Sequence, residues 1–188
     1  MAGAAAAHPE AGRVELWFMD EARVGQKGRT THVWYEKGIR PRGARGVGFA
    51  SAWLFGAACP ERGAAVGLVL PEVSTAAMDR FLAELGATVP PEVQAVLVLD
   101  RAGWHTSRGL AVPPDLTLVH LPPSAPELNP VEKLWQFLRE RLLSHRVFRD
   151  LDAVVDATCA AWNRLVAAPG RVASLTRFPW LPASGGTS

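Results

Sequence analysis

The sequence predicts a single α/β domain in which helices cover both faces of a mixed β-sheet. Its 188 residues are 48% apolar and 20% charged, which is enough apolar material for one sizeable core. A block of strand-like segments comes first, and helical and strand-like segments alternate after it. The segment Ala95–Leu99 is apolar at every position, which is typical of a central strand covered on both sides.

The first half of the chain reads as strands and turns. Val14–Met19 is apolar and aromatic and predicts the first strand. His32–Glu36 predicts a short second strand, and the glycine-rich, basic stretch Gly38–Gly48 predicts a loop or hairpin. Ser51–Cys59 and Ala64–Leu70 predict two further strands in an antiparallel hairpin, because the Pro-Glu-Arg-Gly between them is typical of a turn.

Helices and strands alternate in the second half. A helix is expected from Ser74 to a stop at Gly86, because its apolar residues recur at the i, i+3, i+4, i+7 spacing of one helical face. Strands are expected at Ala95–Leu99 and Thr117–Leu121. Two more helices follow, from Asn129 to about His145 and from Asp150 onward, with inward faces made of Val131, Trp135, Leu138 and Leu142 in the first and Leu151, Val154, Val155, Trp162 and Leu165 in the second.

This order of elements favours a ribonuclease-H-like fold, with a Rossmann-like sheet as the second choice. No Gly-x-Gly-x-x-Gly motif follows the first strand, which counts against dinucleotide binding. Four of the tryptophans are interpreted as core residues: Trp17, Trp53, Trp135 and Trp162.

Composition excludes several classes of protein. The longest aliphatic stretch, Ala95–Leu99, is far shorter than the roughly 18 apolar residues of a membrane span, and no basic residue precedes the alanine run at the N-terminus as in a secretory signal. Cys59 and Cys159, interpreted as core residues, are too far apart for a zinc knuckle or a disulfide scaffold. We therefore expect a cytoplasmic protein with no membrane partner.

Three acidic residues stand at the ends of predicted elements. Asp20 follows the first strand, Asp100 follows the central strand, and Glu132 lies in the first turn of a helix. If those two strands are neighbours, their carboxyl ends bring Asp20 and Asp100 together. Clustered carboxylates repel one another unless cations neutralise them, and oxygen ligands of this kind suit Mg²⁺ or Mn²⁺. Two such ions about 3.5–4 Å apart can promote phosphodiester chemistry.

Each of these acids also has a purely structural interpretation. Asp20 and Asp100 could cap strand ends or begin turns, as aspartates at such places commonly do. Asn129 as N-cap, Pro130 at N1 and Glu132 at N3 would form a capping box favoured by the helix dipole. On a helical wheel Glu132 lies at the border of the apolar stripe, a position that is compatible with a site without requiring one.

Three blocks of sequence surround the acids. The first is Phe18–Arg23 (Phe-Met-Asp-Glu-Ala-Arg), and the second runs from Leu97 to His105 and contains Trp104. The third is Pro126–Trp135 (Pro-Glu-Leu-Asn-Pro-Val-Glu-Lys-Leu-Trp), which closely follows a Leu-Pro-Pro sequence. Together the blocks resemble the DDE transposases of bacterial insertion sequences (insertion-sequence family 630), relatives of the mariner superfamily, over roughly residues 14 to 176. Asp100 and Glu132 lie 32 positions apart, near the spacing in that family. Arg101 stands where many relatives have Asn.

The resemblance implies the catalytic core of a DDE transposase or integrase. Its reaction would be metal-dependent hydrolysis of phosphodiester bonds at transposon ends, followed by attack of the freed 3′-hydroxyl on target DNA. Asp20, Asp100 and Glu132 would be the catalytic residues and would hold Mg²⁺ or Mn²⁺ as two ions. His105 is a candidate auxiliary residue that orients the site or the DNA, with an ordinary loop histidine as the alternative.

A strongly basic segment, residues 23–45, suits a DNA partner. It holds seven basic residues and one acidic residue, a local charge of +6, whereas the whole chain carries +2. The alternative is a solvated basic hairpin. Base stacking by Trp34 and Tyr35 carries little weight, because at strand spacing one of the two faces the core. The basic residues are Arg23, Lys27, Arg29, Lys37, Arg40, Arg42 and Arg45.

We expect three parts in the chain: a disordered N-terminal segment (1–13), the DDE endonuclease/transposase catalytic domain (14–176) and a C-terminal tail (177–188). The helix-turn-helix region of full transposases is missing, so the chain resembles a catalytic half, either a truncated copy or the second frame of a split gene. Expected partners are transposon-end and target DNA, an upstream helix-turn-helix polypeptide and a second copy in a homodimer. Two alternatives remain open: a metal-dependent nuclease without strand transfer, and a repurposed, non-catalytic DNA-binding fragment.

Overall fold

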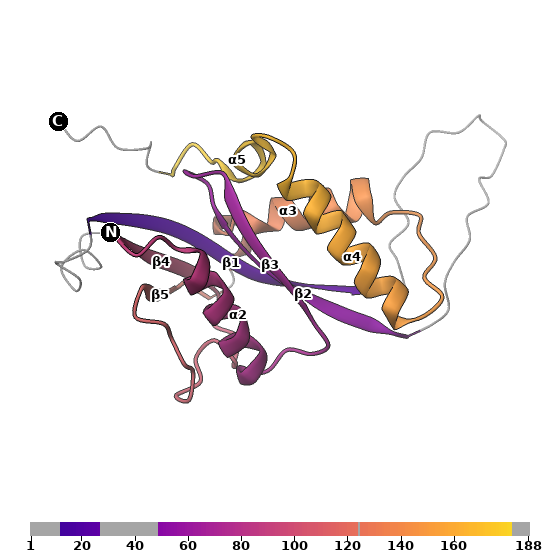
Figure 1. Ribbon diagram of the computed structural model, residues 1–188, viewed down its shortest axis with the longest axis horizontal. Coiled ribbons are helices and arrows are strands. Elements are labelled where there is room, and N and C mark those ends of the chain that lie inside the picture. Colours follow the sequence, from indigo (N-terminus) through magenta and orange to yellow (C-terminus); the bar gives the residue numbers. More distant parts are fainter. Residues whose placement is uncertain (1–11, 27–48, 124, 182–188) are drawn as a thin grey trace.

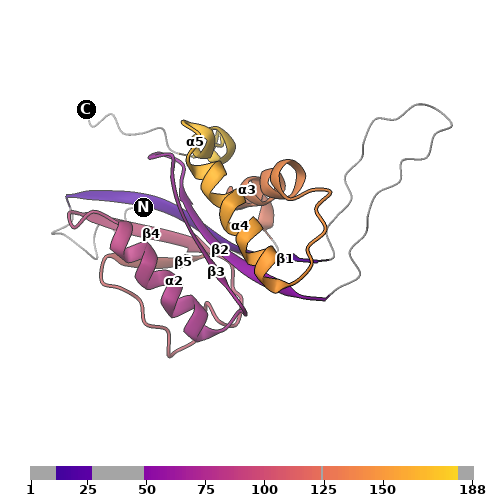
Figure 2. The ribbon, with the colours of Figure 1, turned by 45° about the vertical axis from the view of Figure 1, so that its right-hand side comes forward.

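A computed structural model describes residues 12–26, 49–123 and 125–181, with the side chain of Pro126 left out. Its elements in chain order are β1 (Arg13–Gly25), β2 (Ser51–Cys59), β3 (Ala64–Leu70), α2 (Thr75–Thr88), β4 (Val93–Leu99), β5 (Leu116–His120), the 3-10 turn η1 (Pro126–Leu128), α3 (Val131–Phe137), the π-helical turn η2 (Leu138–Leu142), α4 (Leu151–Val166) and α5 (Arg171–Thr176). The five strands form one sheet, with α2 on one face and α3, α4 and α5 on the other (Figure 1). The turned view separates the same two helical layers (Figure 2).

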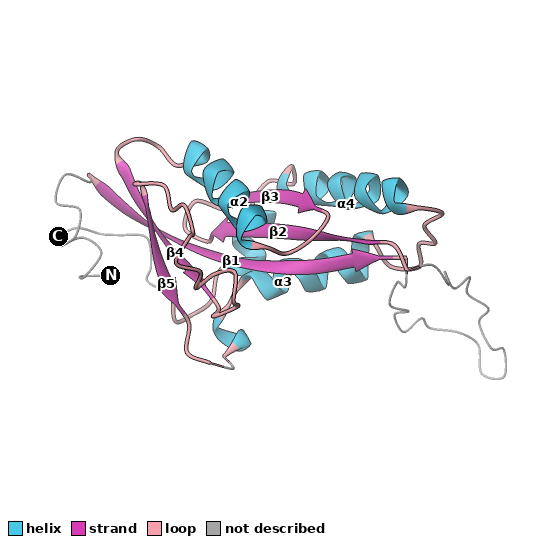
Figure 3. Ribbon diagram, turned by 90° about the horizontal axis from the view of Figure 1, so that it is seen from below, coloured by secondary structure: helices cyan, strands magenta, loops and turns pink. Residues whose placement is uncertain are grey.

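The sheet is mixed, with strand order β3-β2-β1-β4-β5. β1 lies at its centre, antiparallel to β2 and parallel to β4, and β4 is in turn parallel to β5. Figure 3 shows β1 running along the middle of the sheet beside β2 and β4. The mixed sheet with helices on both faces confirms the predicted α/β class, and the adjacency of β1 and β4 confirms that the two aspartate-ended strands are neighbours.

The β2–β3 hairpin is confirmed, with Cys59 paired to Ala64 next to the turn. Gly63 has φ of 64°, a left-handed conformation that glycine adopts without steric cost. Its N–H donates to the carbonyl of Cys59 over 2.9 Å and closes the turn. The four-residue turn between the strands therefore forms as its composition predicts.

The first strand is longer than predicted. It was expected to stop at Asp20, but β1 continues to Gly25 because β2 pairs with it from Phe18 to Gly25. The parallel pairing with β4 ends earlier, at Phe18 and Val98. Asp20 is therefore still paired with β2, but it lies just past the last residue of β1 that pairs with β4.

Two cores lie on the two faces of the sheet. The α2 face packs Trp17 and Phe55 against Phe81, with the two phenylalanine rings 5.8 Å apart. The opposite face packs Trp135 and Trp162 with ring centroids 6.0 Å apart. Burying apolar side chains on both faces is the main favourable contribution to folding.

Some predicted core residues are not buried. Trp17, Trp135 and Trp162 are buried as expected, whereas Trp53 is only partly covered. Cys59 is buried, but the expectation for Cys159 was wrong: it is exposed on the solvent side of α4. Leu151 at the start of the same helix is also 40% exposed, because the first turn of α4 extends past the packed face.

The helix boundaries differ from the predicted ones in three places. The stop predicted at Gly86 was wrong: α2 passes through Gly86 and ends at Thr88, followed by Val89 in an extended conformation. The helix expected from Asn129 to His145 begins at Val131 and changes to the π-helical turn η2, where the N–H of Leu143 reaches back to the carbonyl of Leu138. The short helix α5 was not expected, whereas α4 begins after an Asp150 cap as predicted.

Several predictions lie outside the described residues. These are the strand at His32–Glu36, the loop at Gly38–Gly48, the aromatic pair Trp34 and Tyr35, residues 1–11 of the N-terminal segment and residues 182–188 of the tail. Within the ranges that the structure describes, no helix has the length and apolar character needed to cross a membrane.

Candidate active site

Asp20 projects from β1 toward the face of the sheet that α3 covers. Its carboxylate Oδ2 accepts a hydrogen bond of 2.9 Å from the indole Nε1 of Trp135 on α3. The partner of Asp20 on β2 is Gly56, where a Cβ atom would overlap the Trp135 ring. A glycine at this position thus lets the indole lie on the sheet, and the indole in turn orients the aspartate.

Asp100 stands where β4 ends, at the position that matches Asp20. The last parallel pair is Phe18 with Val98, so each aspartate lies two residues beyond that pair on its own strand. The Asp100 side chain is 59% exposed, and its Oδ1 accepts from the N–H of Ala102 at 2.9 Å. The same oxygen lies 2.7 Å from Nδ1 of His105.

His105 joins two strands through two acids. Its Nδ1 contacts Asp100 and its Nε2 lies 2.7 Å from Oε1 of Glu21, which is also bonded by the indole N–H of Trp104. Burial alone would lower the pKa of His105, but the hydrogen bond and negative charge of Glu21, together with Asp100, raise it above its usual value. The ring is therefore favoured in its protonated form, in which both nitrogens donate.

Glu132 lies in the first turn of α3, which is held against β1 by Asn129. The buried Asn129 side chain donates to the carbonyl of Met19 at 2.8 Å and accepts from the N–H of Val131 at 3.2 Å. The capping box that was the structural alternative for Glu132 is not formed: α3 begins after Pro130 without a side-chain cap, and Glu132 pairs with Arg139 at 3.8 Å. The Glu132 side chain is thus half-exposed and not committed to a helix cap.

The charges of Asp20 and Glu132 act on each other. Burial and the nearby Glu132 charge raise the pKa of the Asp20 carboxyl to about 7, although the Trp135 hydrogen bond opposes the shift. No positive charge from the described residues opposes this shift. In the described part of the chain, however, no three His, Cys, Asp or Glu side chains converge into a group that could hold a metal ion.

Glu21 was not singled out from the sequence, and Asn129 was considered there only as a helix cap. Glu21 is almost completely buried and links His105 to β1, and Asn129 ties α3 to the same strand. Glu21 follows Asp20 directly, and Asn129 belongs to the Glu-Leu-Asn-Pro motif, so both lie within the sequence blocks already identified. Trp135 was interpreted as core, and it is, but its indole N–H also binds Asp20.

The basic segment is described only at its start. Arg23 is exposed on β1, and its Nε donates to Oγ of Ser51 at 3.0 Å. The other six residues of the predicted DNA-binding set lie outside the described residues: Lys27, Arg29, Lys37, Arg40, Arg42 and Arg45. Arg101, the residue that departs from the family pattern, donates from Nε to the carbonyl of Leu121 beyond β5.

Sequence comparison assigns this arrangement to a family. The family described as DDE superfamily endonuclease matches residues 15–155, which contain all three acids and most of the described elements. The chain belongs to the DDE endonuclease superfamily. It is also 50% identical over 129 residues, 69% of its own length and 96% of the other, to the uncharacterized protein y4pE/y4sA of Sinorhizobium fredii (strain NBRC 101917 / NGR234).

Solved structures place the DDE domain in the same fold as a transposase. The Mos1 strand transfer complex matches 86% of this chain and 50% of the Mos1 chain, with TM-score 0.62 and 15% identity. The Mos1 mariner paired end complex with Mn matches 87% of this chain and 56% of that one, with TM-score 0.61 and 16% identity. The fold is therefore the predicted ribonuclease-H-like fold of a DDE transposase catalytic domain, and the chain spans about half the length of the Mos1 chains that it matches.

Proposed function

We propose that this DDE domain cleaves DNA phosphodiester bonds and transfers the freed strand in transposition, with Asp20, Asp100 and Glu132 as its catalytic carboxylates. The proposal rests on the positions of the three acids in the fold. Two aspartates occupy matching places past the last pair of two parallel strands, and the third acid begins the helix that Asn129 fixes on the same strand as Asp20. Membership of the DDE endonuclease superfamily supports the same chemistry.

The donor set is compatible with divalent cations. Three carboxylates offer the hard oxygen ligands that Mg²⁺ and Mn²⁺ prefer, and the raised pKa of Asp20 beside Glu132 marks a place where a positive charge would be stabilising. When bound, a pair of such ions would activate an attacking oxygen and neutralise charge on the leaving oxygen. One of the Mos1 structures is a paired end complex with Mn, which supports the choice of metal.

The protein's own residues orient the carboxylates. The indole of Trp135 fixes one oxygen of Asp20, and His105 fixes one oxygen of Asp100, so both aspartates are oriented before a ligand binds. Among the described residues, the side chain of Glu132 has a half-exposed ion pair with Arg139, which contributes about 0–1 kcal/mol and is released at little cost. His105 is a positioning residue in this proposal, because it acts through Asp100.

DNA is the proposed partner, both as transposon ends and as target. The basic residues between Arg23 and Arg45 would neutralise phosphates, which provides most of the non-specific affinity of a protein for DNA. The Mos1 complexes that share the fold are a strand transfer complex and a paired end complex, which supports a paired assembly. An upstream helix-turn-helix polypeptide and a homodimer belong to the same proposal.

The test uses the purified full chain with labelled DNA. We expect Mg²⁺- or Mn²⁺-dependent nicking and joining of pre-cleaved ends, both abolished in Asp100→Asn. Asp156→Asn is the matched control, because it removes the same charge from an exposed position on α4. Nicked products without joined products would instead indicate a nuclease. DNA left intact by the parent chain, or equal activity in Asp100→Asn, would contradict the proposal.

A further inference from the structure

A row of apolar side chains crosses the sheet directly beside two of the proposed catalytic acids. Phe18, Val98 and Val119 are register partners on β1, β4 and β5, so they stand side by side on the face of the sheet that α3, α4 and α5 occupy. Asp20 and Asp100 lie two residues further along β1 and the chain after β4, a step of about 7 Å for a strand. We call these three side chains the apolar row.

Trp180 packs on the first member of the apolar row. Its ring lies edge-on to Phe18 with the centroids 6.1 Å apart, and the Phe178 ring stacks on it at 5.8 Å with 9° between the planes. A turn holds the two stacked rings, because the N–H of Leu181 donates to the carbonyl of Phe178 over 3.0 Å and Pro179 takes the position where its fixed φ suits a turn. The indole is therefore held in place before any ligand binds.

The packed assembly leaves apolar surface in water at its two ends. Trp180 is 50% exposed and Val119 is 43% exposed, whereas Phe18 and Val98 between them are 2% and 9% exposed. An indole carries the largest apolar surface of any side chain, and burying it is favourable. A rigidly held indole with half its surface exposed, close to a carboxylate site, is suited to a ligand with a flat apolar ring.

The charges around the exposed indole favour a ligand that is also anionic. Arg177 precedes Phe178 and is exposed, and Arg101 is exposed and donates from Nε to the carbonyl of Leu121 just beyond β5. Among the residues that the structure describes, neither arginine pairs with a carboxylate, in contrast to Arg139. A nucleotide combines the flat ring and the negative charge that this surface fits.

We propose that Trp180 stacks on an unpaired nucleobase that flanks the phosphate cleaved at the three acids. This role rests on the proposed function and adds recognition of a base to it. The base must be unpaired, because neighbouring bases cover both faces of a paired base in a duplex. One ring contact and one two-residue step separate the indole from Asp20, about 13 Å in all, so the base lies no more than about four nucleotides from that phosphate.

The experiment compares DNA ends that differ by a single base. Pre-cleaved duplexes carry four unpaired nucleotides beyond the cleavage site, one of them either normal or abasic, and their binding to the full chain is measured by fluorescence anisotropy in Ca²⁺. At one of the four positions the parent chain should bind the normal end about 5- to 150-fold more tightly, because that is the effect of losing one stack of a base on an aromatic ring. Trp180→Leu should reduce this ratio to about one, whereas Trp180→Phe should keep most of it because a phenyl ring still stacks.

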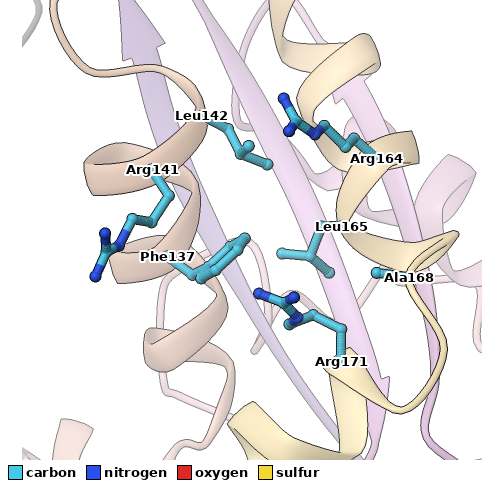
Figure 4. Close-up of a pocket in the computed structure, with 7 residues that line it drawn as sticks. All are labelled: Phe137, Arg141, Leu142, Arg164, Leu165, Ala168 and Arg171. Atoms are coloured by element: carbon cyan, nitrogen blue, oxygen red, sulfur yellow. The ribbon is translucent and has the colours of Figure 1, made fainter.

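Phe137→Leu is the matched control. Phe137 is a half-buried aromatic side chain in the wall of a hollow of about 450 Å³ between η2 and α4, together with Leu165 and Arg171 (Figure 4). No member of the apolar row lines this hollow, so the control should keep the parental ratio. Each ratio is measured on one protein preparation, so a partly unfolded fraction lowers both affinities alike and leaves the ratio unchanged. The salt slope of Trp180→Leu should also equal that of the parent, because no phosphate contact is removed.

The outcomes separate the stacking role from the proposed function. If the parent chain cleaves DNA through Asp100 but binds both ends equally, or if Trp180→Leu keeps the parental ratio, stacking is ruled out and the proposed function stands. If the parent chain neither binds nor cleaves DNA, both are ruled out. Loss of self-association in Trp180→Leu, with the ratio unchanged, would overturn stacking and assign the indole to a contact between two copies of the chain.

Discussion

At the scale of single residues, two of the three proposed catalytic acids are held by side chains that are themselves buried. Asp20 is held by the Trp135 indole and Asp100 by His105, and His105 is fixed from its other side by Glu21. The last contact joins β1 to the loop after β4 across 84 residues of chain. An acid held in this way keeps its orientation before any ligand arrives, which lowers the entropy cost of binding.

The pair of Glu21 and His105 should be energetically coupled. Both side chains are almost completely buried, at 5% and 0% exposure, so removing one partner costs the other a buried hydrogen bond, although His105 keeps Asp100 and Glu21 keeps Trp104. A double-mutant cycle of Glu21→Gln and His105→Gln should give a coupling energy of about 1–3 kcal/mol in urea unfolding. The cycle of Glu21→Gln with exposed Asp156→Asn serves as control and should be additive within about 0.5 kcal/mol. Additivity in both cycles would contradict this account of the link.

At the scale of elements, the sequence predicted the existence of the strands better than their extent. That the two apolar segments ending near an aspartate are neighbours was only a condition of the sequence argument, and the pairing of β1 with β4 meets it. The length of β1 depends on β2, which pairs with it beyond Asp20, and such long-range pairing leaves no local pattern. The contact of Glu21 with His105 also joins segments that are far apart in the sequence, so no local pattern predicts it. The exposure of Cys159 was missed because periodicity alone does not say which face of α4 is covered.

The close approach of α3 to β2 also depends on pairs of residues that no local pattern reveals. Trp135 and Trp162 lie over glycines of the sheet, and a Cβ at Gly56 or Gly67 would overlap one of their rings. Gly56 pairs with Asp20 across β1 and β2, so the glycine, the Trp135 indole and the Asp20 carboxylate form one packed unit. Glycine is used here for space and not for an unusual φ.

Gly56→Ala should therefore damage both packing and the site. The added methyl group displaces the Trp135 ring, with an expected loss of about 1–3 kcal/mol from the free energy of unfolding, and it breaks the hydrogen bond to Asp20. Urea unfolding and Mn²⁺-dependent DNA cleavage both measure the effect. Gly103→Ala is the control, because nothing lies within 4 Å of a Cβ there and its φ is not in the left-handed region. Equal stability of the two variants would show that the ring is not constrained by Gly56.

At the scale of the whole molecule, the central strand β1 connects the two cores and the site. Alternate side chains of β1 belong to opposite cores, with Trp17 and Met19 on the α2 face and Phe18 on the face of α3 to α5. The expected C-terminal tail begins at Arg177, yet its first residues return to this strand. The Trp180 ring lies edge-on to Phe18 at 6.1 Å and stacks on Phe178 at 5.8 Å, and Leu181 packs against the same core.

This contact predicts that the domain needs the residues after α5. Trp180→Ala removes the ring that covers Phe18, two residues before Asp20 on the same face of β1, and should lower the free energy of unfolding by about 1–2 kcal/mol. Faster hydrogen exchange at β1 amides should accompany the loss, because exchange from a strand rises as its packing weakens. Urea unfolding and hydrogen exchange measured by mass spectrometry give the two readouts.

Trp180→Phe separates the ring contact from the loss of a large side chain. A phenyl ring can still meet Phe18 edge-on, so this variant should keep most of the stability and the slow exchange of β1. If Trp180→Ala instead unfolds at the same urea concentration as the parent, residues 177–181 do not contribute to the free energy of unfolding, and the domain boundary expected at Thr176 is correct. If only Trp180→Ala is destabilised, the domain boundary lies beyond Trp180, and the contact between Trp180 and Phe18 is part of the domain's packing against β1.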